Sequence, residues 1–268
     1  MADTRFQLEG SAPQLYERFN VPASTRPSAE QMLEHVSLHE GDRILDAACG
    51  TGIVIRLIAD RFGNIGSFVG MDLNSGMLDV ARENEPNNVS VEWRQGDLCA
   101  LPFPDDSFDV VLCNQGMQYA PDKSVALGEI RRVLASGGRL VFAVWSEEPP
   151  YQMALADALR RHVSAEAAVS TLSGYTLRDT DTIRTLLGGA GFQDIKMQEL
   201  VMTRREPSSA DSVLEFVARM PIARDVATVS EEARQAIGQE VSTALQPYLE
   251  GDEFVMPVKT HVVQAHAS

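Results

Sequence analysis

The sequence predicts an α/β fold: a seven-stranded, mostly parallel sheet with helices on both faces, an antiparallel last strand and a helical cap. Three observations support this prediction. Short apolar segments alternate with helical segments between residues 42 and 145. The connections between them are short, as parallel strand–helix units require. After Trp145 the sequence becomes mainly helical before one last apolar segment. A chain of 268 residues fits one such domain with an elaboration.

The first elements are a helix, a strand and a second helix. A helix is expected at 27–38, because Ser28 and Gln31 have capping-box spacing ahead of an apolar face. Residues 42–48 are a short apolar segment typical of a buried strand. Residues 51–62 carry the helical periodicity that should return the chain across the sheet.

The next elements continue the alternation. Strands are expected at 66–72, at 89–95, where apolar and polar residues alternate, and at 107–114, which is apolar enough to be covered on both faces. A helix at 75–84 connects the first two of these strands. A further helix should run from Asp122, a typical N-cap residue, to about residue 134.

The last part of the chain changes character. The expected elements are a strand at 137–145, helices at 150–168 and 178–191, a long strand at 192–204, mostly helical sequence at 208–249 and a final strand at 253–266. This final strand is expected to re-enter the sheet antiparallel, with the helical excursion lying over one edge of the sheet.

We therefore divide the chain into four segments. They are an N-terminal helical segment that covers the cofactor site (1–40), a core (41–205, with a candidate cap helix at 150–175), a helical cap (206–250), and a final strand with its tail (251–268).

A glycine pair follows the first expected strand. In "LDAACGTGIVIRL" Gly50 and Gly52 lie between the strand and the next helix. Glycine lets a ligand approach the main chain closely, and a helix start offers unpaired N–H groups. In parallel sheets ligands bind at the carboxyl ends of the strands. This loop therefore predicts a ligand cradle.

Two cofactor classes compete for this cradle. A dinucleotide motif would place a third glycine where Ile55 stands, which argues against a pyrophosphate. S-adenosylmethionine has no phosphate but needs close backbone approach and an acid for its ribose. Asp72 ends the second expected strand and could accept the ribose hydroxyls. Asp97 follows the third strand and could accept the adenine amino group, while the amide of Leu98 reaches a ring nitrogen.

Four motifs occur in order across residues 41–146: "ILDAACGTG", "GMDLNSGMLDVAR", "GDLCALPFPDDSFDVVLCNQGMQY" and "EIRRVLASGGRLVFAVW". Together they resemble the class I S-adenosylmethionine-dependent methyltransferases, in particular the small-molecule branch related to ubiquinone and menaquinone biosynthesis. The resemblance implies a Rossmann-like core, S-adenosylmethionine as cofactor, S-adenosylhomocysteine as product, and methylation of a small metabolite at O, N or C.

The resemblance also implies residue roles. Asp46 would help to position the methionyl ammonium group, and Asn114 would offer its backbone to the same end of the cofactor. The remaining expected cofactor contacts are Tyr16, Ala48, Gly50, Gly52, Asp72, Leu73, Met77, Asp97, Leu98 and Gln115. For Tyr16 the alternative is a helix that packs Leu15 and Phe19 against the sheet edge.

Methyl transfer from a sulfonium is an in-line displacement that depends mainly on alignment. Gln115 and Tyr119 follow the fourth strand and are the expected contacts on the substrate side, but no general base is assigned. The five histidines (His35, His39, His162, His261 and His266) have no acid partner evident in the sequence. In the cap, Met153, Phe216, Met220, Tyr248 and Phe254 could line an apolar pocket or form plain core.

Composition limits the remaining partners. A formal charge of −15 disfavours nucleic acid and anionic membranes, and no apolar run spans a bilayer. We expect a cytoplasmic protein with a small-molecule acceptor, no metal site at Cys49, Cys99 and Cys113, and a second copy of the chain as a candidate partner. The alternatives are a non-catalytic S-adenosylmethionine-binding protein and a nicotinamide-dependent oxidoreductase.

Overall fold

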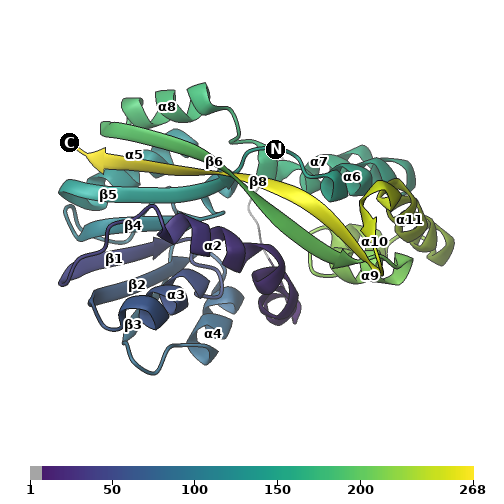
Figure 1. Ribbon diagram of the computed structural model, residues 1–268, viewed down its shortest axis with the longest axis horizontal. Helices are drawn as coiled ribbons and strands as arrows, with labels where there is room; N and C mark the ends of the chain where they lie inside the picture. Colours follow the sequence, from purple (N-terminus) through teal and green to yellow (C-terminus); the bar gives the residue numbers. More distant parts are fainter. Residues whose placement is uncertain (1–7) are drawn as a thin grey trace.

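The computed structural model describes residues 8–268 and consists of a sheet-centred core and a helical lobe joined by a long two-stranded ribbon (Figure 1). The sheet follows the order β3-β2-β1-β4-β5-β8-β6, and a two-residue strand, β7, pairs with β8. The strands are β1 (Asp42–Ala47), β2 (Gly66–Asp72), β3 (Val91–Gln95), β4 (Phe108–Asn114), β5 (Leu134–Trp145), β6 (Phe192–Pro207), β7 (Leu249–Glu250) and β8 (Glu253–Ala267).

The directions of the strands agree with those predicted from the sequence. Strands β1 to β5 pair in parallel, and β8 lies antiparallel between β5 and β6. The prediction of a mostly parallel sheet with an antiparallel last strand is confirmed. The carboxyl ends of β1 to β4 therefore meet at one edge of the core, where the predicted acidic residues follow the strands.

Helices cover both faces of the sheet. On one face, α2 (Arg26–Leu33) and α3 (Ile53–Phe62) pack in a cluster with apolar residues of the sheet. On the other face, α5 (Lys123–Val133) and α8 (Thr180–Gly189) pack in a second cluster. Helix α4 (Ser75–Glu83) contacts β2 and β3. Close helix packing does not explain Gly128 of α5, because a Cβ there would meet nothing within 4 Å.

The N-terminal helix is longer than expected. Helix α1 (Ala12–Leu15), the π-helical segment η1 (Tyr16–Thr25) and α2 follow one another without a break. The predicted capping box is therefore wrong, because Ser28 lies inside the helix. Its buried hydroxyl donates instead to Asn114 Oδ1 at 2.8 Å, which ties the helix to the end of β4.

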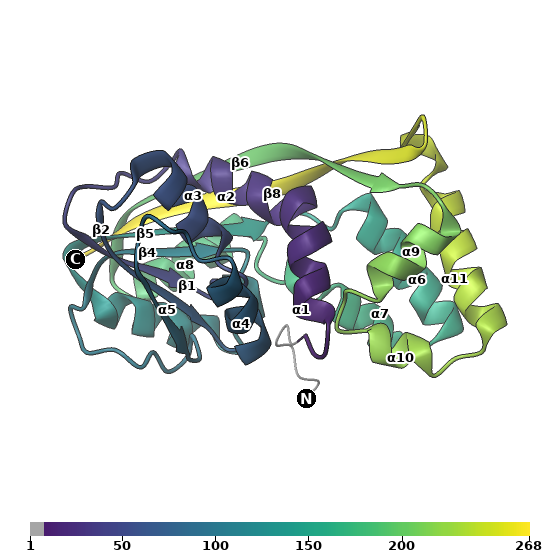
Figure 2. The same ribbon diagram turned by 90° about the horizontal axis from the view of Figure 1, so that it is seen from below.

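The helical lobe has its own apolar core. It contains α6 (Pro150–His162), α7 (Ala165–Thr171), α9 (Ala210–Val217), α10 (Ala223–Ala227) and α11 (Glu231–Ala244), packed with the ribbon end of β8. Figures 1 and 2 place this lobe at the far end of the β6–β8 ribbon. The helical excursion therefore faces the core across the carboxyl ends of the strands.

The N-terminal helix lies between the core and the lobe (Figure 2). The Arg219 guanidinium lies 4.9 Å from the ring centroid of Phe19, and Glu9 forms an ion pair with Arg224. Phe19 thus contacts the lobe.

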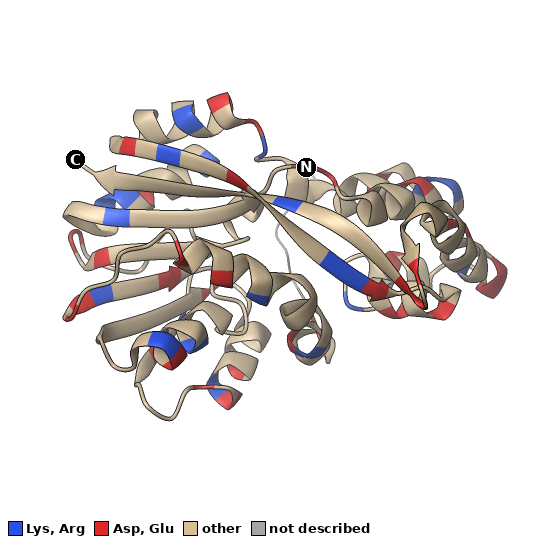
Figure 3. Ribbon diagram, viewed as in Figure 1, with Lys and Arg blue, Asp and Glu red and all other residues tan. Residues whose placement is uncertain are grey.

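Acidic residues are distributed over both the core and the helical lobe (Figure 3). Within residues 8–268, no helix combines the length and the apolar character that crossing a bilayer demands.

Candidate active site

A cavity opens where the strand ends, the N-terminal helix and the helical lobe meet. It contains about 1300 Å³ of empty space, counting the part that is open to solvent. Residues of the core, of the N-terminal helix and of the helical lobe all line it. Its core-side lining includes Tyr16, Asp46, Ala48, Gly50, Asp72, Leu73, Met77, Asp97, Leu98, Asn114, Gln115 and Tyr119. All the predicted site residues except Gly52 therefore line one cavity.

The loop after β1 exposes its backbone to the cavity. Gly50 has φ +55°, and a Cβ added there would meet no atom within 4 Å. Ala48 also has a left-handed backbone, with φ +57°. Strained backbone of this kind is common where a ligand must approach the main chain.

Gly52 has a different structural reason for being glycine. It has φ +83° at the start of α3, and a Cβ there would lie 2.6 Å from the Trp93 ring. Gly70 in β2 makes room for the same ring, at 2.3 Å. These two glycines let the indole lie across the loop, and the contact of Gly52 with a cofactor stays a prediction.

Asp46 is the most unusual group in the cavity. Its carboxylate is buried at the end of β1, and neither oxygen has a hydrogen-bond partner among the described residues. Burial, together with the nearby charge of Asp72, raises the pKa of Asp46 well above its ordinary value. A buried acid without a partner is costly, so this position suits a cationic ligand group.

Two further acids follow β2 and β3. Asp72 accepts hydrogen bonds from the backbone N–H groups of Gly50 and Asn74, both at 2.8 Å. Burial raises the pKa of Asp72 from its ordinary value, although these two hydrogen bonds oppose the change. Asp97 accepts from the backbone N–H of Cys99 at 2.8 Å. A carboxylate has about four lone-pair positions, so both acids can accept further donors from a ligand.

The end of β4 is held by a polar network. The Gln115 side-chain amide donates to the hydroxyls of Ser28 and Thr260, both at 3.0 Å, and accepts from Gln118 at 3.1 Å. Gln115 also has φ +58°. Its side chain thus connects α2, β4 and β8, while the residue lines the cavity. A direct contact with the transferred methyl group stays a prediction.

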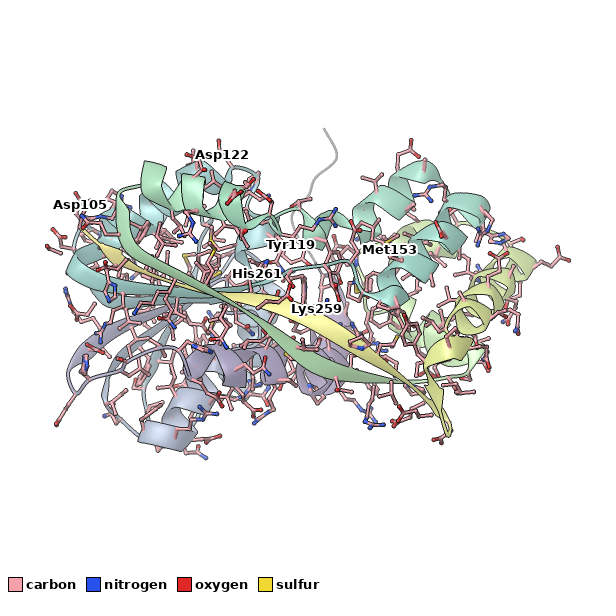
Figure 4. The ribbon with its side chains drawn as sticks, turned by 45° about the horizontal axis from the view of Figure 1, so that its top comes forward. Asp105, Tyr119, Asp122, Met153, Lys259 and His261 are labelled. Atoms are coloured by element: carbon pink, nitrogen blue, oxygen red, sulfur yellow. The ribbon has the colours of Figure 1, made fainter. Side chains whose placement is uncertain are left out.

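The two predicted tyrosines line the cavity from different elements. Tyr16 lies on the N-terminal helix with its hydroxyl 2.9 Å from the Thr25 hydroxyl. Tyr119 follows β4 and lies between the core and the lobe (Figure 4). Burial raises the pKa of both phenols, so both are protonated near neutral pH.

Sequence reasoning missed the lobe side of the cavity. Its lining residues are Trp145, Gln152, Tyr175, Arg204, Phe216 and Met220. They come from β5, α6, β6, α9 and the connections between elements, and only Phe216 and Met220 were candidates. Of the other apolar candidates, Met153 is 41% exposed on α6 (Figure 4) and Phe254 is buried in the lobe core.

The other titratable candidates lie outside this cavity. His162 pairs with Glu240 at 2.7 Å on the lobe, an acid partner that the sequence did not reveal. His261 faces the Arg178 carbonyl oxygen at 3.1 Å. Asp105, in the turn before β4, also lies far from Tyr119 (Figure 4) and pairs with Arg132 at 2.9 Å.

The sheet order and the cavity at the strand ends define an α/β protein of the type that binds a nucleoside-containing cofactor. A family profile described as a methyltransferase domain matches residues 45–142. A demethylmenaquinone methyltransferase from Clavibacter sepedonicus is 32% identical over 172 residues, which are 60% of this chain and 69% of the relative. The chain belongs to the class I S-adenosylmethionine-dependent methyltransferase family.

Two further comparisons agree. A ubiquinone/menaquinone biosynthesis C-methyltransferase from Xanthomonas oryzae is 44% identical over 110 residues, which cover 40% of this chain. The chain spans only 44% of the length of that relative. The crystal structure of the YcgJ protein from Bacillus subtilis shares the fold, with a TM-score of 0.60 and 19% identity over 90% of this chain and 97% of that one.

Proposed function

We propose that the chain transfers a methyl group from S-adenosylmethionine to a small-molecule acceptor. The observation that carries the proposal is the carboxylate of Asp46, which is buried beside the open backbone of Gly50 and has no hydrogen-bond partner among residues 8–268. The methionyl part of this cofactor bears an ammonium group, which would satisfy that carboxylate. A dinucleotide would instead bring a pyrophosphate toward Asp46 and Asp72, and this like-charge contact is unfavourable.

The residues at the strand ends fit the rest of the cofactor. Asp72 can accept the ribose hydroxyls with lone pairs that Gly50 and Asn74 leave unused. Asp97 and Leu98 can hold the adenine edge, and Leu73 and Met77 can pack against its ring. Ala48 and Gly50 would contact the methionyl end through their backbone, and Tyr16 would cover it from the N-terminal helix.

Bound S-adenosylmethionine supplies an activated methyl group on a sulfonium. The chain's own contribution is to align the acceptor with that methyl group and to exclude water. Such alignment is worth about 7–11 kcal/mol of the barrier. The N-terminal helix and the lobe shield the cavity from part of the solvent, and loss of water favours a reaction in which the sulfonium charge disappears.

The side chains that line the lobe side include no obvious base. Burial and neighbouring groups raise the pKa of Tyr119 and of Tyr175, so neither phenol is ionised near neutral pH. Cys49 lines the core side, where burial raises the pKa of its thiol well above the ordinary value. The proposal therefore favours an acceptor whose nucleophilic atom is already electron-rich when it binds.

The relatives' quinone-biosynthesis activities support a small acceptor with an apolar or aromatic body. The lobe side of the cavity has this character, with Trp145, Tyr175, Phe216 and Met220. O-, N- and C-methylation all remain within the proposal.

Calorimetric titration with S-adenosylhomocysteine and with a nicotinamide dinucleotide tests the cofactor. We expect the first to bind and the second to give no heat. Incubation with S-adenosylmethionine and a panel of phenols, quinols and amines then tests turnover, measured as S-adenosylhomocysteine. Binding without turnover across the panel would favour a non-catalytic binding protein.

A further inference from the structure

The lobe side of the cavity contains one buried arginine, although the chain as a whole carries a formal charge of −15. Arg204, on β6, is 7% exposed and lines the cavity. Its guanidinium lies 5.0 Å from the ring centroid of Phe216 and 5.8 Å from that of Tyr151. The two rings hold the planar group in place, because guanidinium groups pack favourably on aromatic faces.

The charges around Arg204 do not balance. Its Nε and Nη2 donate to the same oxygen of Glu206, at 3.0 and 2.6 Å, which leaves Nη1 without a hydrogen-bond acceptor among residues 8–268. Arg219 approaches the other oxygen of Glu206 at 3.7 Å. All three side chains are less than 10% exposed, so two buried cations share one buried anion. Glu215 is exposed on α9, one turn before Arg219 in the chain, and its charge is screened by solvent.

From this arrangement we infer that Arg204 binds an anionic oxygen of the acceptor, so that the substrate is an aromatic or similarly planar anion. The inference rests on the proposed function, since it assigns the acceptor half of the same cavity. Aromatic side chains supply the surface for a flat body, and a guanidinium supplies the donors that carboxylate and phenolate oxygens prefer. An acceptor that already carries negative charge also fits the lobe side's lack of an ionisable base.

Two pairs of probes of equal size test the charge preference: benzoate against benzamide, and 2-naphthoate against 2-naphthamide. Each is titrated calorimetrically into protein saturated with S-adenosylhomocysteine. We expect at least one anion to bind about tenfold or more tightly than its neutral amide, as a charge-assisted contact predicts. Equal affinity within both pairs would overturn the inference.

Matched variants locate the preference. Arg204→Gln should abolish it, whereas Arg205→Gln should keep it. Arg205 is the next residue on the same strand, and its side chain is 55% exposed. Arg205→Gln removes the same charge as Arg204→Gln, but from the surface. Glu206→Gln should increase the preference, because it removes the anion that competes for Arg204. If Arg204 had only a structural role, Arg204→Gln and Glu206→Gln would not change the preference for the anion in opposite directions.

A double variant serves as a control for folding. If Arg204→Gln does not fold because Glu206 loses its main partner, the double variant Arg204→Gln/Glu206→Gln removes both charges and should show no preference. Retained preference in either variant would overturn the inference. Affinity for S-adenosylhomocysteine should stay unchanged throughout. If S-adenosylhomocysteine fails to bind the unmodified protein, the proposed function fails, and the same probe pairs without it still decide the role of Arg204.

Discussion

At the residue scale, Asp46 combines a cost in stability with a use in binding. Burial and the charge of Asp72 raise its pKa, so the folded chain binds this proton more tightly than the unfolded chain. Stability must therefore fall as the pH rises above the ordinary carboxyl pKa of about 4. Such a destabilised group is typical of a binding site, where function and stability compete.

The variant Asp46→Asn should separate these two effects. Near pH 7 we expect it to be more stable than the unmodified chain by about 1–3 kcal/mol, because no unpaired charge is buried. The difference should shrink toward about pH 4. Affinity for S-adenosylhomocysteine should fall about tenfold or more, since the ammonium loses its charged partner. Denaturant unfolding at several pH values measures the stability difference, and calorimetry measures the affinity.

Asp109 provides a control, because its pKa is shifted in the opposite direction to that of Asp46. Its hydrogen bond with Arg43 holds the pKa of this carboxyl at about 2, so its contribution to stability is present at neutral pH and is lost as the pH falls. Asp109→Asn should therefore be slightly destabilising near neutral pH and leave cofactor affinity unchanged. If Asp46→Asn behaved in the same way, the assignment of Asp46 to the ligand would be wrong.

Gly50→Ala tests whether the main chain meets the cofactor. The new methyl group would project into the cavity, so affinity for S-adenosylhomocysteine should drop about 100-fold, equivalent to about 2.8 kcal/mol. Gly63→Ala is the matched control: Gly63 has φ +67° and open space around its Cβ position, but does not line the cavity. Both variants should also lose about 1–3 kcal/mol or more of stability, because a side chain at positive φ is strained. Equal affinities would show that the ligand lies elsewhere.

At the element scale, two helical glycines predict opposite effects on stability. Gly128 in α5 is exposed with nothing within 4 Å of a Cβ, whereas a Cβ at Gly238 in α11 would lie 2.7 Å from the Ala210 carbonyl oxygen. Gly128→Ala should therefore stabilise the chain by about 1 kcal/mol through helix propensity. Gly238→Ala should destabilise it, because α9 must move. Thermal unfolding of the two variants measures the contrast, and a stabilised Gly238→Ala would contradict the packing.

The strands and the core half of the cavity could be predicted from sequence because their signals are local. Strand β2 occupies the residues expected for it. Asp46 and Asp72 lie at the carboxyl ends of β1 and β2, Asp97 follows β3, and these strands are neighbours in the sheet. The N-terminal helix was predicted too short, since the sequence around Pro22 gives no sign of a π-helical segment.

The lobe half of the cavity could not be predicted in the same way. Arg204 reaches it through a strand that continues beyond the sheet as a ribbon, and the partner of Gln115 on β8, Thr260, is 145 residues away. Neither position follows a motif, and no periodicity of the lobe helices specifies which of their faces turns toward the strand ends. The helical lobe forms from residues 150–171 and 210–244, which are distant in sequence and pack together in one apolar core.

At the scale of the whole molecule, three separate parts of the chain form the cavity. The core supplies the strand ends, the N-terminal helix lies across them, and the lobe faces them from the end of the β6–β8 ribbon (Figure 2). Contacts such as that of Arg219 with Phe19 join the lobe to the N-terminal helix. A ligand that touches only one part should restrict only that part, because local opening depends on local contacts.

Hydrogen exchange can follow this division. S-adenosylhomocysteine alone should slow exchange in the loop around Gly50 and in η1, whose residues line the cofactor half of the cavity. Helix α9, which carries Phe216, should become slower only when 2-naphthoate is added as well, because that anion would lie between Arg204 and the lobe. The variant Arg204→Gln should lose the second effect and keep the first. Full protection of α9 by S-adenosylhomocysteine alone would instead mean that the lobe closes on the cofactor, and the cavity would then have no separate acceptor half.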